Sequence, residues 1–153
     1  MSDTAQDNGR TIVVGVDGSA SAEQALRWAV TEAARHGGRV RAIAVREPDD
    51  LLPGTSFAFQ PHGRRPVTDE AGAREYLRGA VTAAAEPGVA VEQTVVAGDP
   101  ASELIKASAE ADLLVLGPHR HGALAEILLG SVSAECVRHA RCPVVVIPAG
   151  LAG

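Results

Sequence analysis

Five short apolar segments alternate along this chain with four longer segments of helical periodicity, and this alternation limits the possible folds more than any other feature. Three of the apolar segments are nearly continuous runs of valine, isoleucine and leucine, as in parallel strands that are buried on both faces. Strands are expected at 11–16, 40–45, 89–96, 112–116 and 143–147. The pattern predicts an α/β fold, in which an open five-stranded parallel sheet with right-handed crossovers carries helices on both faces.

The four intervening helices have their own start and stop signals. The first is expected at 21–36, where a pair of glycines ends it, and the second at 68–85, before a Glu-Pro-Gly break. A short third helix follows Asp99, a typical N-cap residue, and the fourth begins at Gly130. The inward faces of these last two helices are expected to consist of Leu104, Ile105, Ser108, Val132, Cys136, Val137 and Ala140.

The length of 153 residues corresponds to one domain with a single core. We expect a disordered tail at 1–10 and the domain at 11–149. Only 3% of the residues are aromatic, so the core must consist mainly of alanine, valine, leucine and isoleucine. The formal net charge of −5 argues against a surface dedicated to nucleic acid. No apolar run is long enough to cross a bilayer and no secretory signal is recognisable, so we expect no membrane association and a cytoplasmic location.

One segment, 47–66, interrupts the alternation. It contains four prolines and two phenylalanines and has neither helical nor strand periodicity, so we expect a mobile loop. A tolerated surface insertion would explain it, because surface loops accept extra length at small entropic cost. The alternative is a lid, in which Phe57 and Phe59 fold over a bound ring.

The cysteines and histidines do not indicate a redox or metal centre. Cys136 and Cys142 are six residues apart, which is neither a CxxC spacing nor a zinc half-site, so both are expected to be small core side chains. His119 and His121 have no acidic or cysteine partner nearby in the sequence. They are better explained as extra donors toward phosphate than as metal ligands.

Glycine-containing turns follow the first and fourth expected strands, and these turns are where a binding site is expected. In an open α/β sheet, ligands bind at the carboxyl ends of the strands, where the strand order reverses. The turns lie at 15–19 and 117–122, and the last helix opens with 130–133. Free amides at a helix N-terminus favour phosphate, although 130–133 also fits an ordinary helix cap and Asp17 also fits a turn-capping role. Neither a P-loop nor a GxGxxG motif is present.

Five motifs, in order and across nearly the whole chain, resemble those of a universal stress protein domain. They are IVVGVDGS at 12–19, GDPA at 98–101, ADLLVLG at 111–117, LLGSVS at 128–133 and CPVVVI at 142–147. The resemblance implies a Rossmann-like (HUP-type) sheet in the order 3-2-1-4-5, whose reversal falls beside Asp17 and Gly117. It also implies a homodimer paired through the last strand, from Val144 to Ile147, and ATP as the ligand of many members.

The phosphate-binding pattern of the ATP-binding members is matched here with one departure. Gly117 fits the first glycine, and Gly130 with Ser131 fits the final Gly-Ser pair, but Arg120 stands at the second glycine position. If that position needs a positive φ or close approach to phosphate, a Cβ there costs on the order of 1–2 kcal/mol and weakens affinity about tenfold. If its φ is ordinary, the guanidinium supplies a bidentate clamp on phosphate, and Gly122 offers another place for the tight bend.

By the same resemblance, Asp17 contacts the ribose or the base, the main chain near Val16 and Val45 lies along the adenine, and the later turns hold the phosphates. The complete expected nucleotide site consists of Gly15, Val16, Asp17, Val45, Leu116, Gly117, His119, Arg120, Gly122, Gly130, Ser131, Val132 and Ser133.

Together these features predict a dimeric, adenine-nucleotide-binding regulatory protein of the stress response. No nucleophile with a base and no pair of carboxylates is recognisable at the strand ends, so we expect slow ATP hydrolysis at most. The expected ligand is ATP, with Mg²⁺ carried on its phosphates. Three alternatives stay open: a dimeric interaction protein that has lost nucleotide binding through Arg120, a cyclic AMP-binding member, and an adenylating ligase, whose phosphate loop the turn at 15–19 matches only in part.

Overall fold

The computed structural model describes residues 9–46, 70–118 and 129–148, and within them the expected alternation of strands and helices is present. The expected loop at 47–66 lies outside the described residues, as do His119, Arg120 and Gly122 and most of the expected tail. The elements are β1 (Arg10–Gly15), α2 (Ala20–His36), β2 (Gly38–Arg46), α3 (Glu70–Ala84), β3 (Val91–Ala97), α4 (Pro100–Ser108), β4 (Leu113–Leu116), α5 (Ser131–His139) and β5 (Val144–Val146).

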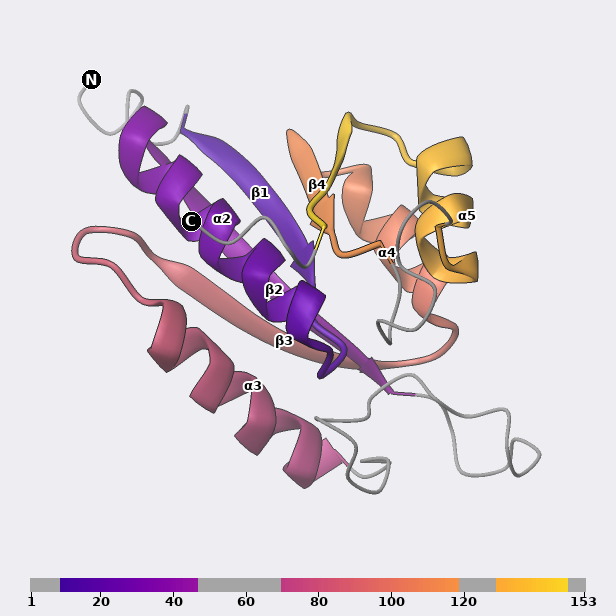
Figure 1. Cartoon of the computed structure of the whole chain (residues 1–153), viewed down its shortest axis with the longest axis horizontal. Coiled ribbons are helices and arrows are strands. Elements are labelled where there is room, and N and C mark those ends of the chain that lie inside the picture. The colour runs from indigo at the N-terminus through magenta and orange to yellow at the C-terminus, as the bar shows by residue number, and fades with distance from the viewer. Residues whose placement is uncertain (1–8, 47–69, 119–128, 149–153) are drawn as a thin grey trace.

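The strands form one parallel sheet in the order β3-β2-β1-β4-β5, which confirms the expected topology (Figure 1). The central strand is β1, in which Ile12 is opposite Val40 of β2 on one side and Leu113 of β4 on the other. The strand order therefore reverses between β1 and β4. At one edge, β3 has no fully buried residue, in agreement with its alternating sequence.

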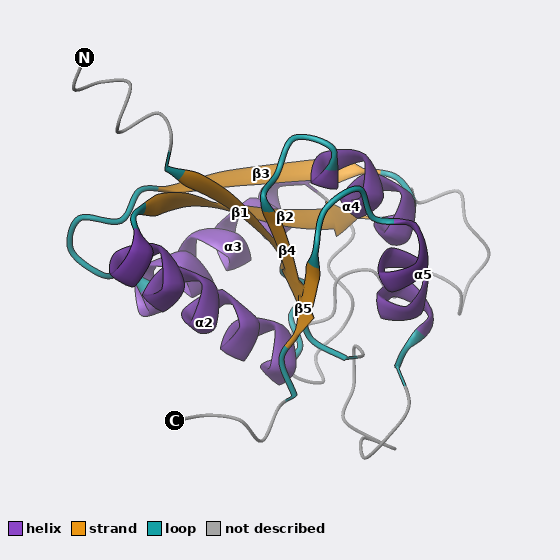
Figure 2. Ribbon diagram, turned by 90° about the horizontal axis from the view of Figure 1, so that it is seen from above, coloured by secondary structure: helices purple, strands orange, loops and turns teal. Residues whose placement is uncertain are grey.

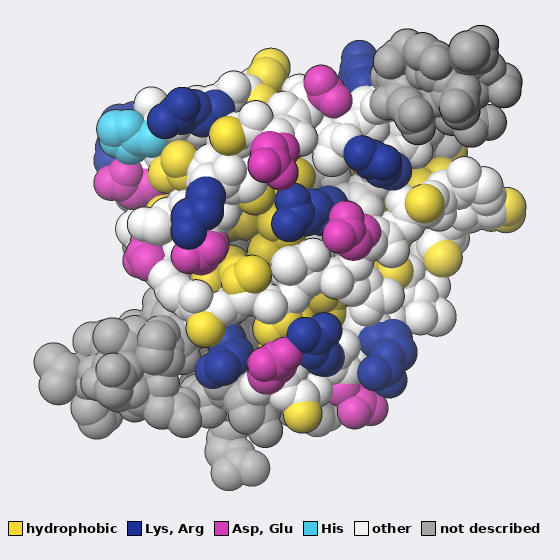
Figure 3. All heavy atoms as spheres, turned by 180° about the vertical axis from the view of Figure 1, so that it is seen from behind, with side chains coloured by type: hydrophobic (Ala, Val, Ile, Leu, Met, Phe, Trp, Pro, Cys, Tyr) yellow, Lys and Arg dark blue, Asp and Glu magenta, His cyan; other side chains and the backbone are white. Residues whose placement is uncertain are grey.

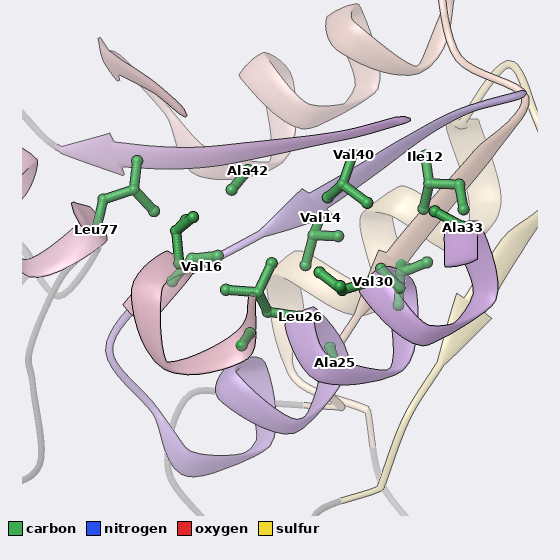
Figure 4. Packing of buried hydrophobic residues seen from close by; sticks show 14 of the residues in the cluster. Ile12, Val14, Val16, Ala25, Leu26, Val30, Ala33, Val40, Ala42 and Leu77 are labelled. Carbon is green, nitrogen blue, oxygen red and sulfur yellow. The ribbon is translucent and has the colours of Figure 1, made fainter. Parts of the chain in front are cut away.

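Helices cover both faces of the sheet, with α2 and α3 on one face and α4 and α5 on the other (Figure 2). Alternate residues of β1 divide between two core clusters. Ile12 and Val14 pack beneath α2 and α3 (Figure 4), whereas Val13 packs with Leu104 of α4 and Cys136 of α5. Because both faces of the central strands are buried in this way, their carboxyl ends are the places where a ligand can reach the sheet.

The first helix, α2, ends where its pair of glycines predicts, and one of its faces is buried. Gly37 has φ 76°, and its amide donates to the carbonyl oxygen of Ala33 at 2.9 Å, as at a glycine C-cap. Gly38 has φ 157°, and a Cβ there would lie 2.7 Å from the carbonyl oxygen of Arg10. The apolar residues that recur at helical spacing are all buried, namely Ala22, Ala25, Leu26, Ala29, Val30 and Ala33.

Some sequence expectations are wrong in detail. Val137 was expected on the inward face of α5, but it is 49% exposed. It follows the fully buried Cys136 by one position, about 100° around the helix, and this nine-residue helix buries only a narrow stripe against the sheet. Ile105 of α4 is only partly buried. Strand ends differ from the expected ones by at most two residues, and β1 already begins at Arg10.

Charges of both signs are interspersed on the surface that Figure 3 shows. Along the helices, opposite charges one turn apart form ion pairs, such as Arg74 with Glu70 at 2.6 Å and Lys106 with Glu103 at 3.5 Å. Such pairs are exposed and contribute little to stability. In the part of the chain that the structure describes, no helix has the length and apolar character of a membrane span.

Candidate functional site

The end of β4 is the point where three segments of the chain meet. Beyond Leu116, two residues leave the sheet and are bonded to the start of α5. The carbonyl oxygen of Gly117 accepts a hydrogen bond from Ser133 Oγ at 2.7 Å, and that of Pro118 accepts one from the Gly130 amide at 2.7 Å. Two successive carbonyl groups therefore fasten this turn to the first turn of α5.

Gly117 also lies against the first turn of α2, closer than a residue with a side chain could. A Cβ on Gly117 would lie 2.9 Å from Ser21 Cβ and 3.0 Å from the Ser21 carbonyl carbon, and closer still to Ser21 Oγ. Its φ is outside the left-handed region, so the requirement is for space. The glycine at the end of β4 therefore lets α2, β4 and α5 converge.

The turn between β1 and α2 is held by Asp17 and Ser19. Oδ1 of Asp17 accepts hydrogen bonds from the Ser19 amide at 3.0 Å and the Ser19 hydroxyl at 2.7 Å. Ser19 is the N-cap of α2, since its Oγ accepts a hydrogen bond from the Ala22 amide at 3.1 Å. The turn-capping role considered for Asp17 is thus present, and it acts through Ser19. Ser19 is not among the expected site residues, although a serine just before a helical pattern is a recognisable N-cap signal.

The first turn of α5 presents main-chain amides. Its N-cap, Gly130, has φ −70° and ψ 172°, and no side-chain cap hydrogen bond is made there within the described residues. The first amides of a helix lack acceptors inside the helix and carry partial positive charge. Ser131 is exposed, whereas Ser133 is buried and donates its hydroxyl proton to Gly117. The groups of this turn that remain for a phosphate are therefore the exposed Ser131 side chain and the amides without an acceptor inside the helix, rather than the Ser133 hydroxyl proton.

Three residues of the expected site, two of which were expected along the adenine (Val16 and Val45), have their side chains in the core. Val16, Val45 and Leu116 are 2%, 5% and 4% exposed, so only their main chains could line a ligand. The Val16 amide donates to the Ile43 carbonyl oxygen at 2.9 Å, which continues the pairing of β1 with β2 beyond Gly15. The structure thus brings the end of β4 and the first turns of α2 and α5 together, while Val45 lies one strand away on β2.

Neither cysteine is activated as a nucleophile. Burial raises the pKa of the Cys136 thiol to about 11, with smaller contributions from the charges of Glu135 and Asp99. Burial, followed by the charge of Asp112, also raises the pKa of Cys142. Cys136 is confirmed as a core residue, and Cys142 is partly buried. Among the residues with described positions, no three His, Cys, Asp or Glu side chains are grouped as metal ligands.

The fold and its strand-end turns define a Rossmann-like α/β domain whose candidate site lies between the central strands. The model described as "Universal stress protein family" matches residues 9–148. The chain therefore belongs to the universal stress protein family, as its motifs indicated.

Curated relatives of this family are longer than the chain. Universal stress protein Rv2005c of Mycobacterium tuberculosis is 39% identical over 141 residues, which cover 88% of this chain and 44% of that protein. Universal stress protein Rv1996 of the same organism is 35% identical over 158 residues, which cover 95% of this chain and 50% of that protein. The chain spans about half the length of these relatives, or less.

Solved structures of the family match nearly the whole chain. A protein from Burkholderia pseudomallei is 31% identical with a TM-score of 0.63, covering 91% of this chain and 96% of that one. A universal stress protein in complex with cAMP is 28% identical with a TM-score of 0.65, covering 93% and 98%. One from Archaeoglobus fulgidus in complex with dAMP is 29% identical with a TM-score of 0.64, covering 90% and 97%. Two structural relatives were therefore solved with an adenine nucleotide.

Proposed function

We propose that this chain is an adenine-nucleotide-binding regulatory domain and that the ligand lies at the carboxyl ends of β1 and β4. The observation that carries the proposal is the convergence of the first turns of α2 and α5 on Gly117 and Pro118. Helix N-termini concentrate partial positive charge and unpaired amides, which suit a phosphate group. The cAMP and dAMP complexes of two relatives support adenine as the base.

Little or no turnover is part of the proposal. The polar side chains at this strand end build the turns: Ser133 donates to Gly117, Ser19 caps α2, and Asp17 accepts both hydrogen bonds from Ser19. The Ser133 hydroxyl donates to a carbonyl oxygen and so is not paired with a general base. The Ser19 hydroxyl donates to the Asp17 carboxylate, but the same oxygen caps α2 by accepting the Ala22 amide, so it serves the helix rather than a reaction. Slow hydrolysis of ATP would be the upper limit.

We propose ATP, with Mg²⁺ carried on its phosphates, as the ligand in the cell, and a cytoplasmic role in the stress response. The protein would then need no metal cage of its own, because Mg²⁺ often binds through substrate phosphates and water. Calorimetric titration with ATP in the presence of Mg²⁺ and in excess EDTA measures the contribution of the ion. A weaker but measurable affinity in EDTA is the expected result.

Removal of one main-chain amide at the start of α5 gives the decisive test. Ser131 is the first helical residue, where proline is tolerated, and the extended Gly130 before it has backbone angles that suit a residue preceding proline. Ser131→Pro should weaken ATP binding about tenfold, since one charge-assisted hydrogen bond is lost while the helix is retained. The matched control is Ser131→Ala, which keeps the amide.

Calorimetry on the two variants, with circular dichroism as the check on folding, separates the outcomes. If Ser131→Pro binds ATP as tightly as Ser131→Ala does, phosphate does not use this turn and the proposed site is wrong. If the wild-type protein binds no adenine nucleotide at millimolar concentration, the function itself is wrong, and a dimeric interaction protein without nucleotide takes its place.

A second candidate ligand is an adenine nucleotide with one phosphate. It is favoured by the two nucleotide complexes among the relatives, since both cAMP and dAMP carry a single phosphate. Competition between ATP and cyclic AMP in one titration decides between them. Displacement of ATP by equimolar cyclic AMP would support the second candidate.

We also propose that the chain forms a homodimer through the open edge of β5. The Leu114 amide of β4 donates to the Pro143 carbonyl oxygen, and the Ile147 amide donates to the Leu116 carbonyl oxygen. The odd-numbered residues along β5 therefore bond to β4. The amides of Val144 and Val146 must then point to the open edge. Ile147 itself, which we expected within the pairing edge, is 4% exposed and belongs to the core.

A proline at an outward amide tests the dimer without removing a bond to β4. Val146→Pro should convert a dimer into a monomer in light scattering after size exclusion, because edge prolines block strand pairing. Val146→Ala, which keeps the amide, should stay dimeric. A monomeric wild-type protein, or a dimer that survives the proline, would exclude this interface.

A further inference from the structure

Tyr76, the only tyrosine in the sequence, links α3 to the first turn of α2. Its hydroxyl donates a hydrogen bond to Oε2 of Glu23. The Glu23 amide donates to the Ser19 carbonyl oxygen at 3.2 Å, so Glu23 closes the first hydrogen-bonded turn of the helix. Ser21, which touches Gly117, is two positions earlier, about 200° around the helix. This turn is therefore held from opposite sides, by the end of β4 and by Tyr76.

The tyrosine hydroxyl is a permanent donor near the candidate site. Burial, the hydrogen bond to Glu23 and the negative charges of Glu23 and Asp17 all raise the pKa of Tyr76 above its ordinary value. The hydroxyl therefore stays protonated at neutral pH.

The bond is accessible without opening the core. Glu23 and Tyr76 line a groove of about 370 Å³ between α2 and α3, together with Arg27, Glu75 and four small residues of α3. The tyrosine ring itself packs against the core cluster beneath α2 and α3. The ring thus anchors the residue in the core, and the hydroxyl is the part that reaches α2.

We propose that Tyr76 is a positioning residue of the nucleotide site: through Glu23 it fixes the first turn of α2, and with it the Asp17–Ser19 turn, against the end of β4. Tyr76 contacts no ligand in this scheme. The inference rests on the proposed nucleotide function, and it adds that α3, which contributes no residue to the site, controls the geometry of the site. A change at the α2–α3 groove would then alter nucleotide affinity.

Tyr76→Phe removes the hydroxyl and keeps the ring. Amide hydrogen exchange without nucleotide should become about fivefold faster at residues 20–23, because the first turn loses its anchor, and remain unchanged at the carboxyl end of α2. The dissociation constant for ATP should rise about threefold to tenfold. Thr82→Val is the matched control, since it deletes a hydroxyl from an exposed position of the same helix. Glu23→Gln keeps an acceptor for Tyr76 and should exchange like the wild type.

Each result has a defined meaning. Unchanged exchange at residues 20–23 in Tyr76→Phe overturns the proposal, whatever the affinity does. Faster exchange with an unchanged dissociation constant also overturns it, because Tyr76 would then stabilise the helix without positioning the site. If wild-type protein binds no adenine nucleotide, the proposed function fails and the link to affinity fails with it, while the exchange data still show whether Tyr76 holds this turn.

Discussion

Replacement of Gly117 by alanine tests the convergence on which the site depends. The new Cβ would lie 2.9 Å from Ser21 Cβ and 3.0 Å from the Ser21 carbonyl carbon, both closer than normal contacts. One of these contacts is main chain, so the first turn of α2 must move. Overpacking of this kind costs about 1–3 kcal/mol. For a domain of this size, a loss of about 2 kcal/mol lowers the melting temperature by about 4–8 °C.

The affinity for ATP should fall at least about tenfold in Gly117→Ala, because separating α2 from β4 misplaces donors that must act together. Denaturant unfolding and calorimetry measure the two effects. The matched control for the unfolding assay is Gly79→Ala in α3, where a Cβ meets nothing within 4 Å and should stabilise the helix by about 0.5–1 kcal/mol. Adding Ser21→Ala to Gly117→Ala should restore only part of the stability and ATP affinity that Gly117→Ala loses. A Gly117→Ala protein as stable and as tightly binding as the wild type would refute the packing argument.

Four further predictions concern stability and reactivity. Gly37→Ala should lower the free energy of unfolding by about 1 kcal/mol in denaturant titrations, because φ is 76° there. Asp99→Ala should lower the free energy of unfolding by about 1 kcal/mol in the same assay, because Asp99 accepts a hydrogen bond from the Ser102 amide at 2.9 Å. Asp99→Asn, which keeps an acceptor oxygen at the N-cap, should retain most of this stability. The pKa of Cys136 is about 11 in the folded protein and 9.0 when unfolded, so the thiol of the unfolded chain ionises first. The free energy of unfolding should therefore fall as the pH rises from 9 toward 11, and this fall should be smaller in Cys136→Ala. Mass spectrometry after alkylation should find Cys142 modified before Cys136, since only Cys136 is fully buried.

Local signals in the sequence were sufficient for most of the fold. The continuous valine-rich strands specify a sheet buried on both faces, and Gly37 and Asp99 mark helix ends by requirements of single residues. The family resemblance supplied the strand order, because composition and periodicity do not determine which strands are neighbours. The elements were predictable because each depends on a short segment, and the strand order was predictable because the family motifs cover nearly the whole chain.

The parts of the site that depend on contacts between distant segments could not be predicted. The helical pattern includes Ser21 but does not reveal its contact with Gly117, which decides how close α2 comes to β4. Ser133 was expected to face phosphate, but its hydroxyl is used on the Gly117 carbonyl oxygen. Val137 fits the helical period and is nevertheless exposed, because the narrow buried stripe of α5 ends at Cys136. Periodicity identifies an amphipathic face, and tertiary packing decides how wide it is.

With its net charge of −5, the domain as a whole repels a polyanionic ligand. Attraction must come from local dipoles, and the effect of a helix N-terminus falls off within its first turn. One phosphate can lie within that distance of α5, whereas the outer phosphates of ATP need donors beyond it. Among the expected site residues, the remaining cationic candidate is Arg120, outside the described part of the chain. The ratio of the affinities for ATP and AMP therefore measures what residues 119–128 add: a ratio near one would assign phosphate binding to α5 alone, and a large ratio abolished by Arg120→Ala would assign the outer phosphates to the guanidinium.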